Sequence, residues 1–423
     1  MRNTSSFWVI LGVILIIDIY VFQAVRTITV SASSKQRIIV YSIYWTLSVL
    51  TILVFTFLPY LTGIKGIKLA RATLFTLPVG LFLAKIIASI FFLTDDIRRT
   101  FVWIWQAFNK GVNQGITADA VGDTISRSAF LSWAGVLVGG GLFSTLIYGM
   151  NNRYRYQVTK NKLRFSTLPE AFNGLKVVHI SDIHSGSFND KAAVLKGVEK
   201  IMKQNPDLIL FTGDLVNNVA VEMEDYIEVF KKLNAPMGVY ATLGNHDYGD
   251  YVAWESKEAK QKNLQQLKNV FDELGWKLLM NEHVVFSKNN EEIALIGIEN
   301  WSAKARFPKY GNMQKAYEGT EKYPFKILMS HDPSHWKAQV IPSFSSVDLT
   351  LSGHTHGMQF GLELPGIKWS PVQYMYKEWA GLYEYENQKL YVNRGFGFLG
   401  YPGRVGVLPE ITVLELFSDK INS

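Results

Sequence analysis

Four long apolar stretches dominate the first third of the chain. Residues 6–25 are apolar except for one aspartate, and 38–61 and 128–150 carry no charged side chain. Residues 72–94 are apolar except for one lysine. Because a helix needs about 20 predominantly apolar residues to cross a bilayer, the pattern predicts a transmembrane region over 1–150 with four spanning helices at about these positions.

The two charges inside these stretches fall at matching depths. Asp18 lies twelve residues after the start of the first span and Lys85 thirteen after the start of the third, and both spans enter from the same side. At about 1.5 Å rise per residue they reach nearly the same level, where an isolated charge is unfavourable by roughly 2.5–3.5 kcal/mol. We expect the first and third helices to be neighbours with Asp18 and Lys85 paired; the alternative is that each faces a polar cavity or the interface alone.

The segment between the third and fourth spans begins with a charged cluster at 95–99, followed by aromatic residues within 101–105. Aromatic side chains suit the membrane interface, so we interpret about thirty residues here as an interfacial loop. The alternative is that the third helix continues past the bilayer.

From residue 151 the pattern becomes that of a soluble α/β domain, which we predict over 151–423. Stretches at 190–203, 221–233 and 260–275 place Val, Leu, Ile and Phe at helical spacing between Lys and Glu, and a first strand is expected at 154–165. Helices alternating with strands are typical of an α/β sandwich, a sheet-containing core covered by helices.

Five short apolar runs in this domain end in side chains that bind metals. The runs at 175–181, 207–212, 237–243, 326–330 and 349–352 lead into the motifs Asp-x-His, Gly-Asp, Gly-Asn-His-Asp, His-Asp and Gly-His-x-His. Neutral imidazole is the commonest side-chain metal ligand. The recurrence predicts a sheet with a metal site along one edge.

These five motifs, in this order, resemble those of the calcineurin-like metallophosphoesterases, over roughly residues 154–417. The resemblance implies that Asp214 bridges two divalent metal ions (Mn, Fe, Zn or similar). It implies that the other ligands are Asp182, His184 and His356 for the first ion, and Asn245, His331 and His354 for the second.

The resemblance also implies that His246 is catalytic, lying over the leaving group as a general acid or a stabiliser of phosphate charge. Asp247 or another carboxylate would orient it. Asp332, which follows a ligand, either orients that ligand or is a loop carboxylate. Among the other histidines, we expect His179 in the core and His283 and His335 at the surface.

The membrane-anchored bacterial branch of the family shares a stretch around 393–411 with this chain. That branch commonly has Gly-Gly-Gln after the last ligand histidine, where this chain has Gly-Met-Gln. Met358 therefore changes the pocket shape that we expect. Arg394 and Arg404 either hold a substrate phosphate or are solvated loop cations.

Hydrolysis of a phosphate ester requires a strong nucleophile and relief of charge on the phosphoryl oxygens, and a pair of divalent cations supplies both. We predict a membrane-anchored, metal-dependent phosphoesterase acting on diester, monoester or pyrophosphate bonds. Lipid-linked phosphates are among the substrate classes. The similar UDP-2,3-diacylglucosamine hydrolases would fit a cytoplasmic face, whereas an outward face would favour phospholipid, cell-wall polymer or nucleotide-type esters. The alternative is a non-enzymatic membrane scaffold or metal sensor, whose signature would be a missing ligand; here all seven positions and His246 are filled.

The composition and net charge restrict the metal ligands and binding partners that we expect. The chain has no cysteine, which excludes disulfides and thiolate ligands and leaves nitrogen and oxygen to bind metal. Its formal net charge of +7 over 423 residues comes from dispersed Lys and Arg. We therefore expect a phosphate substrate and the membrane as partners, and no nucleic acid.

An even number of spans places the N-terminus and the soluble domain on the same side of the membrane. The distribution of Lys and Arg favours a cytoplasmic domain by a narrow margin. Residues 126–131, however, resemble a twin-arginine export signal that lacks its second arginine, which would place Arg127 in the cytoplasm. We expect a multi-pass protein of the cell membrane with an extracytoplasmic catalytic domain.

Overall fold

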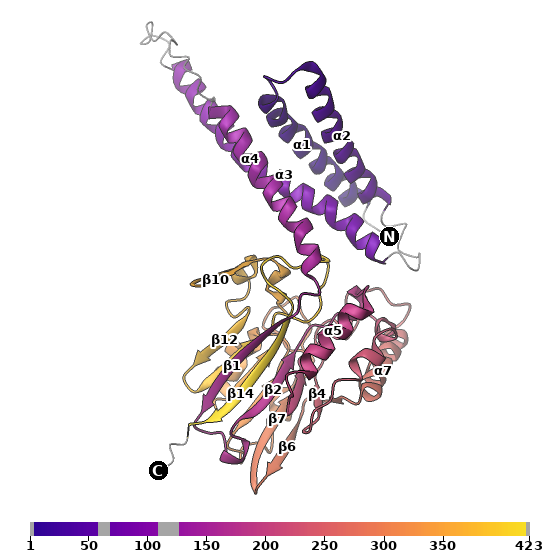
Figure 1. Cartoon of the computed structure of the whole chain (residues 1–423), viewed down its shortest axis with the longest axis vertical. Helices are drawn as coiled ribbons and strands as arrows, with labels where there is room; N and C mark the ends of the chain where they lie inside the picture. Colours follow the sequence, from indigo (N-terminus) through magenta and orange to yellow (C-terminus); the bar gives the residue numbers. More distant parts are fainter. Residues whose placement is uncertain (1–3, 58–67, 109–126, 420–423) are drawn as a thin grey trace. The chain divides into compact units, whose positions relative to one another are not determined.

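The computed structural model describes residues 4–57, 68–108 and 127–419 (Figure 1). The chain forms two compact units, Met1–Tyr148 and Gly149–Ser423. The first contains four apolar helices and the second a mixed α/β domain, so the predicted fold class is confirmed.

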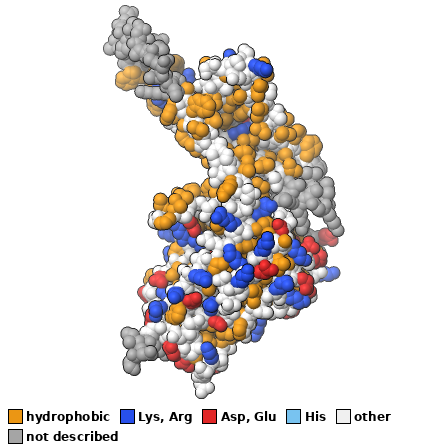
Figure 2. All heavy atoms as spheres, in the orientation of Figure 1, with side chains coloured by type: hydrophobic (Ala, Val, Ile, Leu, Met, Phe, Trp, Pro, Cys, Tyr) orange, Lys and Arg blue, Asp and Glu red, His pale blue; other side chains and the backbone are white. Residues whose placement is uncertain are grey.

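The helices of the first unit are α1 (Thr4–Ile28), α2 (Ser34–Phe57), α3 (Lys68–Phe108) and α4 (Arg127–Gly149). Within the part of the chain that the structure describes, four stretches are long and apolar enough to cross a membrane: Trp8–Ile28, Ser34–Phe57, Thr73–Trp105 and Ser128–Asn152. Figure 2 shows that hydrophobic side chains predominate over these helices, as expected of surfaces that face lipid. Residues 58–61 of the second predicted span lie outside the described residues.

Helix α3 includes the segment that we predicted as the start of an interfacial loop. Residues 95–105 continue the helix to Phe108, so the loop prediction was wrong there. The charged cluster does not end the helix because Asp95 accepts hydrogen bonds from Arg98 one turn later (2.9 Å) and from Ser128 of α4 (2.6 Å). At 1.5 Å per residue the helix is about 60 Å long, twice the hydrocarbon thickness of about 30 Å.

Helices α1 and α3 are neighbours, and their charges are paired. The Nζ atom of Lys85 lies 2.6 Å from Oδ1 of Asp18 and 2.9 Å from Oγ of Ser48 on α2. Both charged side chains are buried. The hydroxyl of Tyr44 donates to the backbone carbonyl of Asp18 (2.7 Å). The predicted Asp18–Lys85 pair is confirmed.

Two six-stranded sheets form the centre of the second unit (Figure 1). In spatial order, the first contains β1 (Gln157–Phe165), β14 (Glu410–Ser418), β2 (Leu175–Ile180), β3 (Leu208–Phe211), β4 (Val239–Ala241) and β5 (Lys277–Leu278). The second contains β12 (Gly381–Tyr385), β13 (Gln388–Val392), β9 (Leu349–Ser352), β8 (Lys326–Met329), β7 (Glu291–Gly297) and β6 (Glu282–Lys288). A separate hairpin pairs β10 (Leu362–Leu364) with β11 (Ile367–Trp369).

Helices cover the outer faces of both sheets. Those on the first sheet are α5 (Lys191–Met202), α6 (Ile227–Phe230) and α7 (Lys257–Leu274). Those on the second are α8 (Met313–Tyr317) and a π-helical turn (Trp336–Val340) that leads into α9 (Ile341–Ser343). Short 3₁₀ turns connect the elements at Met150–Asn152, Glu170–Phe172, Ser185–Ser187, Ala220–Met223, His356–Gln359 and Pro371–Tyr374.

The central strands are apolar on both faces because each sheet lies between two cores. In β3, Ile209 and Phe211 pack against the helices, whereas Leu208 and Leu210 face the second sheet. This alternation follows from the two-residue period of a strand. The result is a four-layered sandwich.

The helix predicted over 221–233 does not form as one element; it is a 3₁₀ turn followed by the single turn α6. Met223, Tyr226, Phe230 and Leu233 are buried at the helical spacing that the prediction used. Two short turns bury these side chains without a continuous helix, so the spacing identified the buried face but not the length of the element.

Candidate active site

The predicted site lies where strands of both sheets end. Strands β2, β3 and β4 are parallel neighbours in the first sheet, and β8 and β9 are parallel neighbours in the second. The loops after β2 and β9 meet where the backbone N–H of His354 donates to the carboxylate of Asp182 (3.0 Å). The expectation of one sheet edge was therefore wrong: two sheets contribute to the site.

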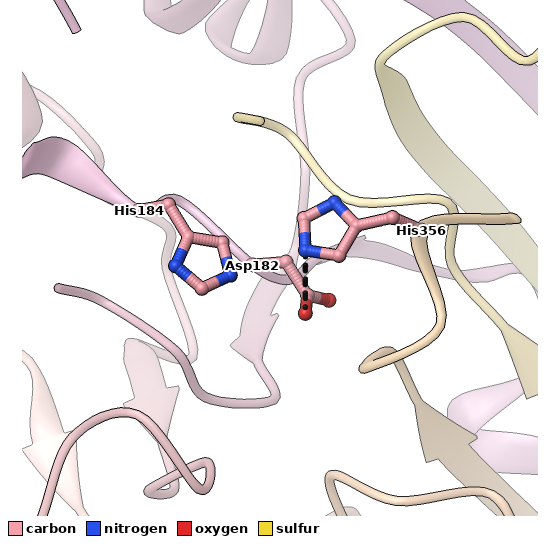
Figure 3. Close-up of side chains that lie close together, drawn as sticks. All are labelled: Asp182, His184 and His356. Atoms are coloured by element: carbon pink, nitrogen blue, oxygen red, sulfur yellow. Dashed lines mark ion pairs between the residues drawn. The ribbon is translucent and has the colours of Figure 1, made fainter. Parts of the chain in front are cut away.

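Six of the seven predicted ligands form two buried or nearly buried groups. Asp182, His184 and His356 make the first (Figure 3), and Asp214, His331 and His354 make the second. Within each group, one ligand atom from every residue lies within 4.8 Å of the others. In the first group, the His356 ring contacts Asp182 at 3.3 Å.

Asp214 connects the two groups. Its Oδ2 atom lies 3.5 Å from Nε2 of His184 in the first group and 3.2 Å from Nε2 of His331 in the second. Its other oxygen accepts a hydrogen bond from the backbone N–H of His246 (2.8 Å). One carboxylate oxygen thus reaches both groups, which is the position that a bridging ligand requires.

Asn245, the seventh predicted ligand, points its amide oxygen at the second group. Oδ1 lies 2.8 Å from Nδ1 of His354 and 3.2 Å from Nε2 of His331. The amide nitrogen donates to the hydroxyl of Tyr251 (2.8 Å), which fixes this orientation. Sequence reasoning missed Tyr251, which lies four residues after the Gly-Asn-His-Asp motif, because a tyrosine at that spacing matches no metal-ligand pattern.

Buried hydrogen bonds orient the imidazoles of the second group. Nδ1 of His331 donates to the backbone carbonyl of Thr212 (2.7 Å), which leaves Nε2 directed at the site. Nε2 of His354 lies 2.9 Å from the hydroxyl of Tyr376, which donates to Asp332 (3.1 Å). Asp332 is therefore an orienting residue that acts through Tyr376, and sequence reasoning did not identify this tyrosine.

The donor atoms fit divalent cations. Among the described residues, the two ring nitrogens of His184 and Nε2 of His356 make no hydrogen bond, although Nε2 of His356 lies 3.3 Å from Asp182 and Nε2 of His184 lies 3.5 Å from Asp214. A buried polar atom without a hydrogen bond is costly unless something else binds it. Burial lowers the pKa of His184 to about 3, so this ring is neutral, the form that binds metal. Nitrogen and oxygen donors with two carboxylates suit Zn, Fe or Mn.

The carboxylates of the site are ionised. Burial alone would raise the pKa of Asp182 and Asp214, but the neighbouring imidazoles, His356 for the first and His331 for the second, outweigh burial and lower both pKa values. Burial would likewise lower the pKa of His331, but Asp214 raises it to about 10. A cation that binds His331 would therefore displace a proton.

The backbone of the site is strained. Asp182, His184, Asp214, His354 and His356 all have φ between 48° and 71°, the left-handed region that non-glycine residues rarely adopt. Such conformations persist only where the surrounding structure imposes them, and they cluster at functional sites.

Two positions of the motifs must be glycine because the backbone there lies directly against a carboxylate of the site. A Cβ atom on Gly353 would lie 2.1 Å from Oδ2 of Asp182, and one on Gly244 would lie 2.2 Å from Oδ1 of Asp214. Any side chain at these positions would displace a predicted ligand.

His246 is partly exposed beside the first group, with its ring 5.0 Å from that of His184. Its Nδ1 donates to the backbone carbonyl of Asn217 (2.7 Å), so Nε2 is the nitrogen that can transfer a proton. We expected a carboxylate to orient His246, but the backbone carbonyl of Asn217 takes that position. Asp247 instead accepts hydrogen bonds from the backbone N–H groups of Asp214, Leu215, Val216 and Gly244.

The two groups open into a pocket of about 170 Å³. Besides the predicted ligands, its lining includes the apolar side chains of Phe307, Met358, Val372 and Met375, while Arg306 adds a positive charge. Met358 is half exposed and shapes the pocket at the position where the bacterial branch commonly has glycine.

Arg394 and Arg404 do not line this pocket. Arg404 is fully buried and donates to the backbone carbonyls of His356, Arg394, Gly395 and Gly397. Arg394 pairs with Glu410 (2.8 Å) and Glu363 (2.9 Å). Neither alternative, phosphate ligand or solvated loop cation, describes these arginines, since Arg404 is fully buried and the partly exposed Arg394 is paired with two carboxylates.

The remaining histidines are outside the site. His179 is buried within the first sheet, 2.9 Å from the hydroxyl of Thr212, as predicted. His335 is also buried, between Ser330 and Gln339, so its predicted surface position was wrong. His283 is partly buried, and its ring contacts a backbone carbonyl.

Comparison with known proteins supports the same assignment. Residues 1–153 match the family described as the probable calcineurin-like phosphoesterase transmembrane domain, and 175–358 match the calcineurin-like phosphoesterase family. The uncharacterized metallophosphoesterase YkuE of Bacillus subtilis is 30% identical over 293 residues, which cover 67% of this chain and 93% of that protein.

Two further relatives are membrane or lipid enzymes by name. A transmembrane protein with metallophosphoesterase domain from Danio rerio is 30% identical over 64% of this chain, which spans only 60% of that protein. The UDP-2,3-diacylglucosamine pyrophosphatase LpxG of Chlamydia trachomatis is 30% identical over 54% of this chain and 81% of its own length.

The apolar helices, the candidate site and the matched relatives all support a membrane-bound metallophosphoesterase. The four apolar helices and the matching transmembrane family make this a multi-pass membrane protein. The second unit is that of a hydrolase whose family implies divalent metal ions, and it carries two Asp/His groups able to hold them. The chain belongs to the calcineurin-like metallophosphoesterases.

Proposed function

We propose that this protein hydrolyses phosphate-ester or pyrophosphate bonds by a two-metal mechanism, with a catalytic domain over 151–423 anchored by a transmembrane region over 1–150. The observation that supports this most strongly is that one oxygen of Asp214 reaches an imidazole of each buried Asp/His group. In this proposal Asp214 bridges two cations. Asp182, His184 and His356 hold the first, and Asn245, His331 and His354 hold the second.

When bound, two divalent cations activate water as a nucleophile and neutralise charge on the phosphoryl oxygens. The surrounding residues complement this chemistry. The amide of Asn245 binds without adding a negative charge that would repel the phosphate. His246, with Nδ1 bound to a carbonyl, offers Nε2 to protonate the leaving oxygen. Arg306 at the pocket wall attracts the anionic substrate.

We propose a lipid-linked phosphate or pyrophosphate as the substrate class. The pocket joins the predicted metal ligands to an apolar wall of Phe307, Met358 and Met375, which suits an amphipathic molecule. The four membrane helices place the enzyme among lipids. The relative LpxG is named for a diacylated, nucleotide-linked pyrophosphate.

We further propose that the catalytic domain faces outward, on the basis of the export-like segment 126–131, of which residue 126 lies outside the described residues. Because the chain has no cysteine, a single Val221→Cys variant on the exposed surface of the domain provides a direct test. A membrane-impermeant maleimide is expected to label it in intact cells. Labelling only after lysis would place the domain in the cytoplasm.

Metal-dependent hydrolysis by the purified full chain tests the function. Chelator-treated protein is expected to lose activity on a chromogenic phosphodiester and to regain it with Mn²⁺, Fe²⁺ or Zn²⁺. His331→Ala is expected to be inactive, whereas the control His283→Ala, outside the site, keeps its activity. Metal binding without hydrolysis of any diester, monoester or pyrophosphate would favour the non-enzymatic alternative, and activity that is independent of metal would contradict the mechanism.

A further inference from the structure

The β10–β11 hairpin presents an apolar face to its surroundings. In its register Leu362 pairs with Trp369 and Leu364 pairs with Ile367, so these four side chains share one face. Their exposed fractions are 44%, 38%, 55% and 53%, respectively. Figure 2 shows hydrophobic side chains gathered over the segment labelled β10 in Figure 1.

The opposite face of the hairpin is polar and is attached to the domain. Glu363 accepts a hydrogen bond from Nε of Arg394 (2.9 Å). Lys368 donates to the backbone carbonyl of Ala380 and lies 4.8 Å from the ring centroid of Trp379. An antiparallel hairpin in water normally turns its apolar face to the protein and its polar face to solvent. Here the arrangement is reversed.

Two exposed methionines that flank the hairpin in the sequence line the catalytic pocket. Met358, just before β10, and Met375, after β11, are 51% and 38% exposed, and both line the pocket together with the predicted metal ligands. We call the four hairpin residues with Met358 and Met375 the apolar rim. An exposed apolar surface of this kind marks an interaction site.

The apolar rim is connected to the end of the last membrane span. The backbone N–H of Gly361, next to β10, donates to the carbonyl of Val405 (2.9 Å). The preceding residue, Arg404, donates its N–H to the carbonyl of Gly149 (2.9 Å), and its own carbonyl accepts from Asn152 (3.2 Å). The fourth apolar stretch ends at Asn152, so within the second unit the adjacent residues Arg404 and Val405 join the hairpin to the last residues of that stretch.

We propose that the apolar rim is inserted into the surface of the bilayer that the four helices span, so that the catalytic pocket opens onto membrane lipid. Interfacial segments of this kind bury their apolar face about 5–10 Å into the headgroup boundary. A bilayer is favoured over a protein partner because backbone hydrogen bonds join the hairpin to the residues that end the fourth apolar stretch. The docking is independent of the chemistry, whereas the lateral entry of a lipid substrate rests on the proposed function.

A spin label on the full chain in phospholipid nanodiscs tests the docking without any substrate. The cysteine-free chain allows Leu364→Cys to be compared with the control Val221→Cys, which is equally exposed (58%) on a different part of the domain. The measured quantity is the ratio of collisions with oxygen, which concentrates in lipid, to collisions with a water-soluble nickel complex. We expect this ratio to be several-fold higher for the label at 364 than for the control at 221. Equal collision ratios at the two positions would overturn the proposal. Spin–spin broadening at 364 would also overturn it, because a second copy of the chain would then cover the hairpin.

Activity on two substrates tests lateral entry. The double variant Leu364→Ser/Ile367→Ser is expected to lose about tenfold or more in kcat/KM on a nucleotide–lipid pyrophosphate held in nanodiscs, the factor that corresponds to about 1.4 kcal/mol. The double variant should keep its activity on a soluble chromogenic diester. The control Val221→Ser should keep its activity on both substrates. An equal loss on the two substrates, or no loss, would contradict lateral entry. A wild-type protein inactive on both would refute the proposed function, while the spin label would still decide the docking.

Discussion

Replacing Asp247 tests how the two metal-binding loops are held together. Its carboxylate is fully buried. Oδ2 accepts from the N–H groups of Asp214 (2.8 Å) and Gly244 (2.9 Å), and Oδ1 accepts from those of Leu215 (2.8 Å) and Val216 (3.3 Å). One side chain therefore ties the loop after β3, which carries the proposed bridging ligand, to the loop after β4.

The variant Asp247→Asn keeps the side-chain volume nearly constant, so its loss of stability can be estimated from the hydrogen bonds alone. Whichever way the new amide turns, its NH₂ group faces two backbone donors, and both lose their acceptor. Each buried donor without a partner costs about 1–3 kcal/mol, so the free energy of unfolding should fall by about 2–6 kcal/mol. Residues that orient metal ligands typically contribute about 10–100-fold in metal affinity, and we expect a loss in that range.

The assay combines thermal unfolding with activity measured against metal concentration. Asp348→Asn is the matched control, because Asp348 is also a buried acceptor but lies at the opposite ends of β8 and β9. There it accepts from the N–H of Lys326 (2.7 Å) and the hydroxyl of Thr167. The control should unfold more easily while the metal concentration for half-maximal activity stays unchanged. Asp247→Asn should change both quantities.

Two results would refute this reasoning. If Asp247→Asn kept the wild-type metal dependence, the loops would hold their places without the carboxylate. If Asp348→Asn raised the metal requirement as much as Asp247→Asn did, metal affinity would follow the global stability of the domain rather than the local hydrogen bonds.

Three further predictions concern the site and the helices. Asp214→Asn should nearly abolish hydrolysis and reduce metal content from about two per chain, because the proposed bridge is lost; full metal content with normal turnover would contradict it. His246→Ala should keep its metals but lower turnover by about 10²–10⁴-fold, most for poor leaving groups; equal slowing of good and poor leaving groups would show that His246 is not the acid. Asp18→Asn leaves the Lys85 charge buried and should destabilise the helices by about 3–5 kcal/mol in thermal unfolding, whereas the exchanged variant Asp18→Lys/Lys85→Asp should recover part of this; no recovery would argue against the pair.

Local signals account for what could be predicted. Each predicted ligand follows an apolar run directly in the sequence, so the strand and its terminal side chain are identified together. Strands β2, β3, β8 and β9 begin and end within two residues of the predicted runs. The Asp18–Lys85 pair was predictable for a similar reason, because the rise of a helix is fixed and depth can be counted along the chain.

Contacts between distant segments account for what was missed. Nothing in the apolar runs distinguishes the strands of the first sheet from those of the second, because both sheets lie between two cores. Tyr376 and Arg306 reach the site from loops without a recognisable motif, and Tyr251 lies four residues beyond the Gly-Asn-His-Asp motif. Asp247 was one candidate carboxylate for orienting His246, but its carboxylate accepts from four backbone N–H groups instead.

Arg404 contacts both a proposed metal ligand and the residues at the end of the fourth apolar stretch. Its guanidinium is buried, where a charge persists only if polar groups surround it, and it contacts both the backbone carbonyl (3.3 Å) and the ring (3.2 Å) of His356, a proposed metal ligand. Its backbone binds Gly149 and Asn152 at the end of the fourth span. A soluble fragment that begins at residue 151 would lose the bond to Gly149 and loosen the loop that carries Arg404. We therefore expect the position of His356, a proposed metal ligand, to be less well defined in such a fragment than in the full chain.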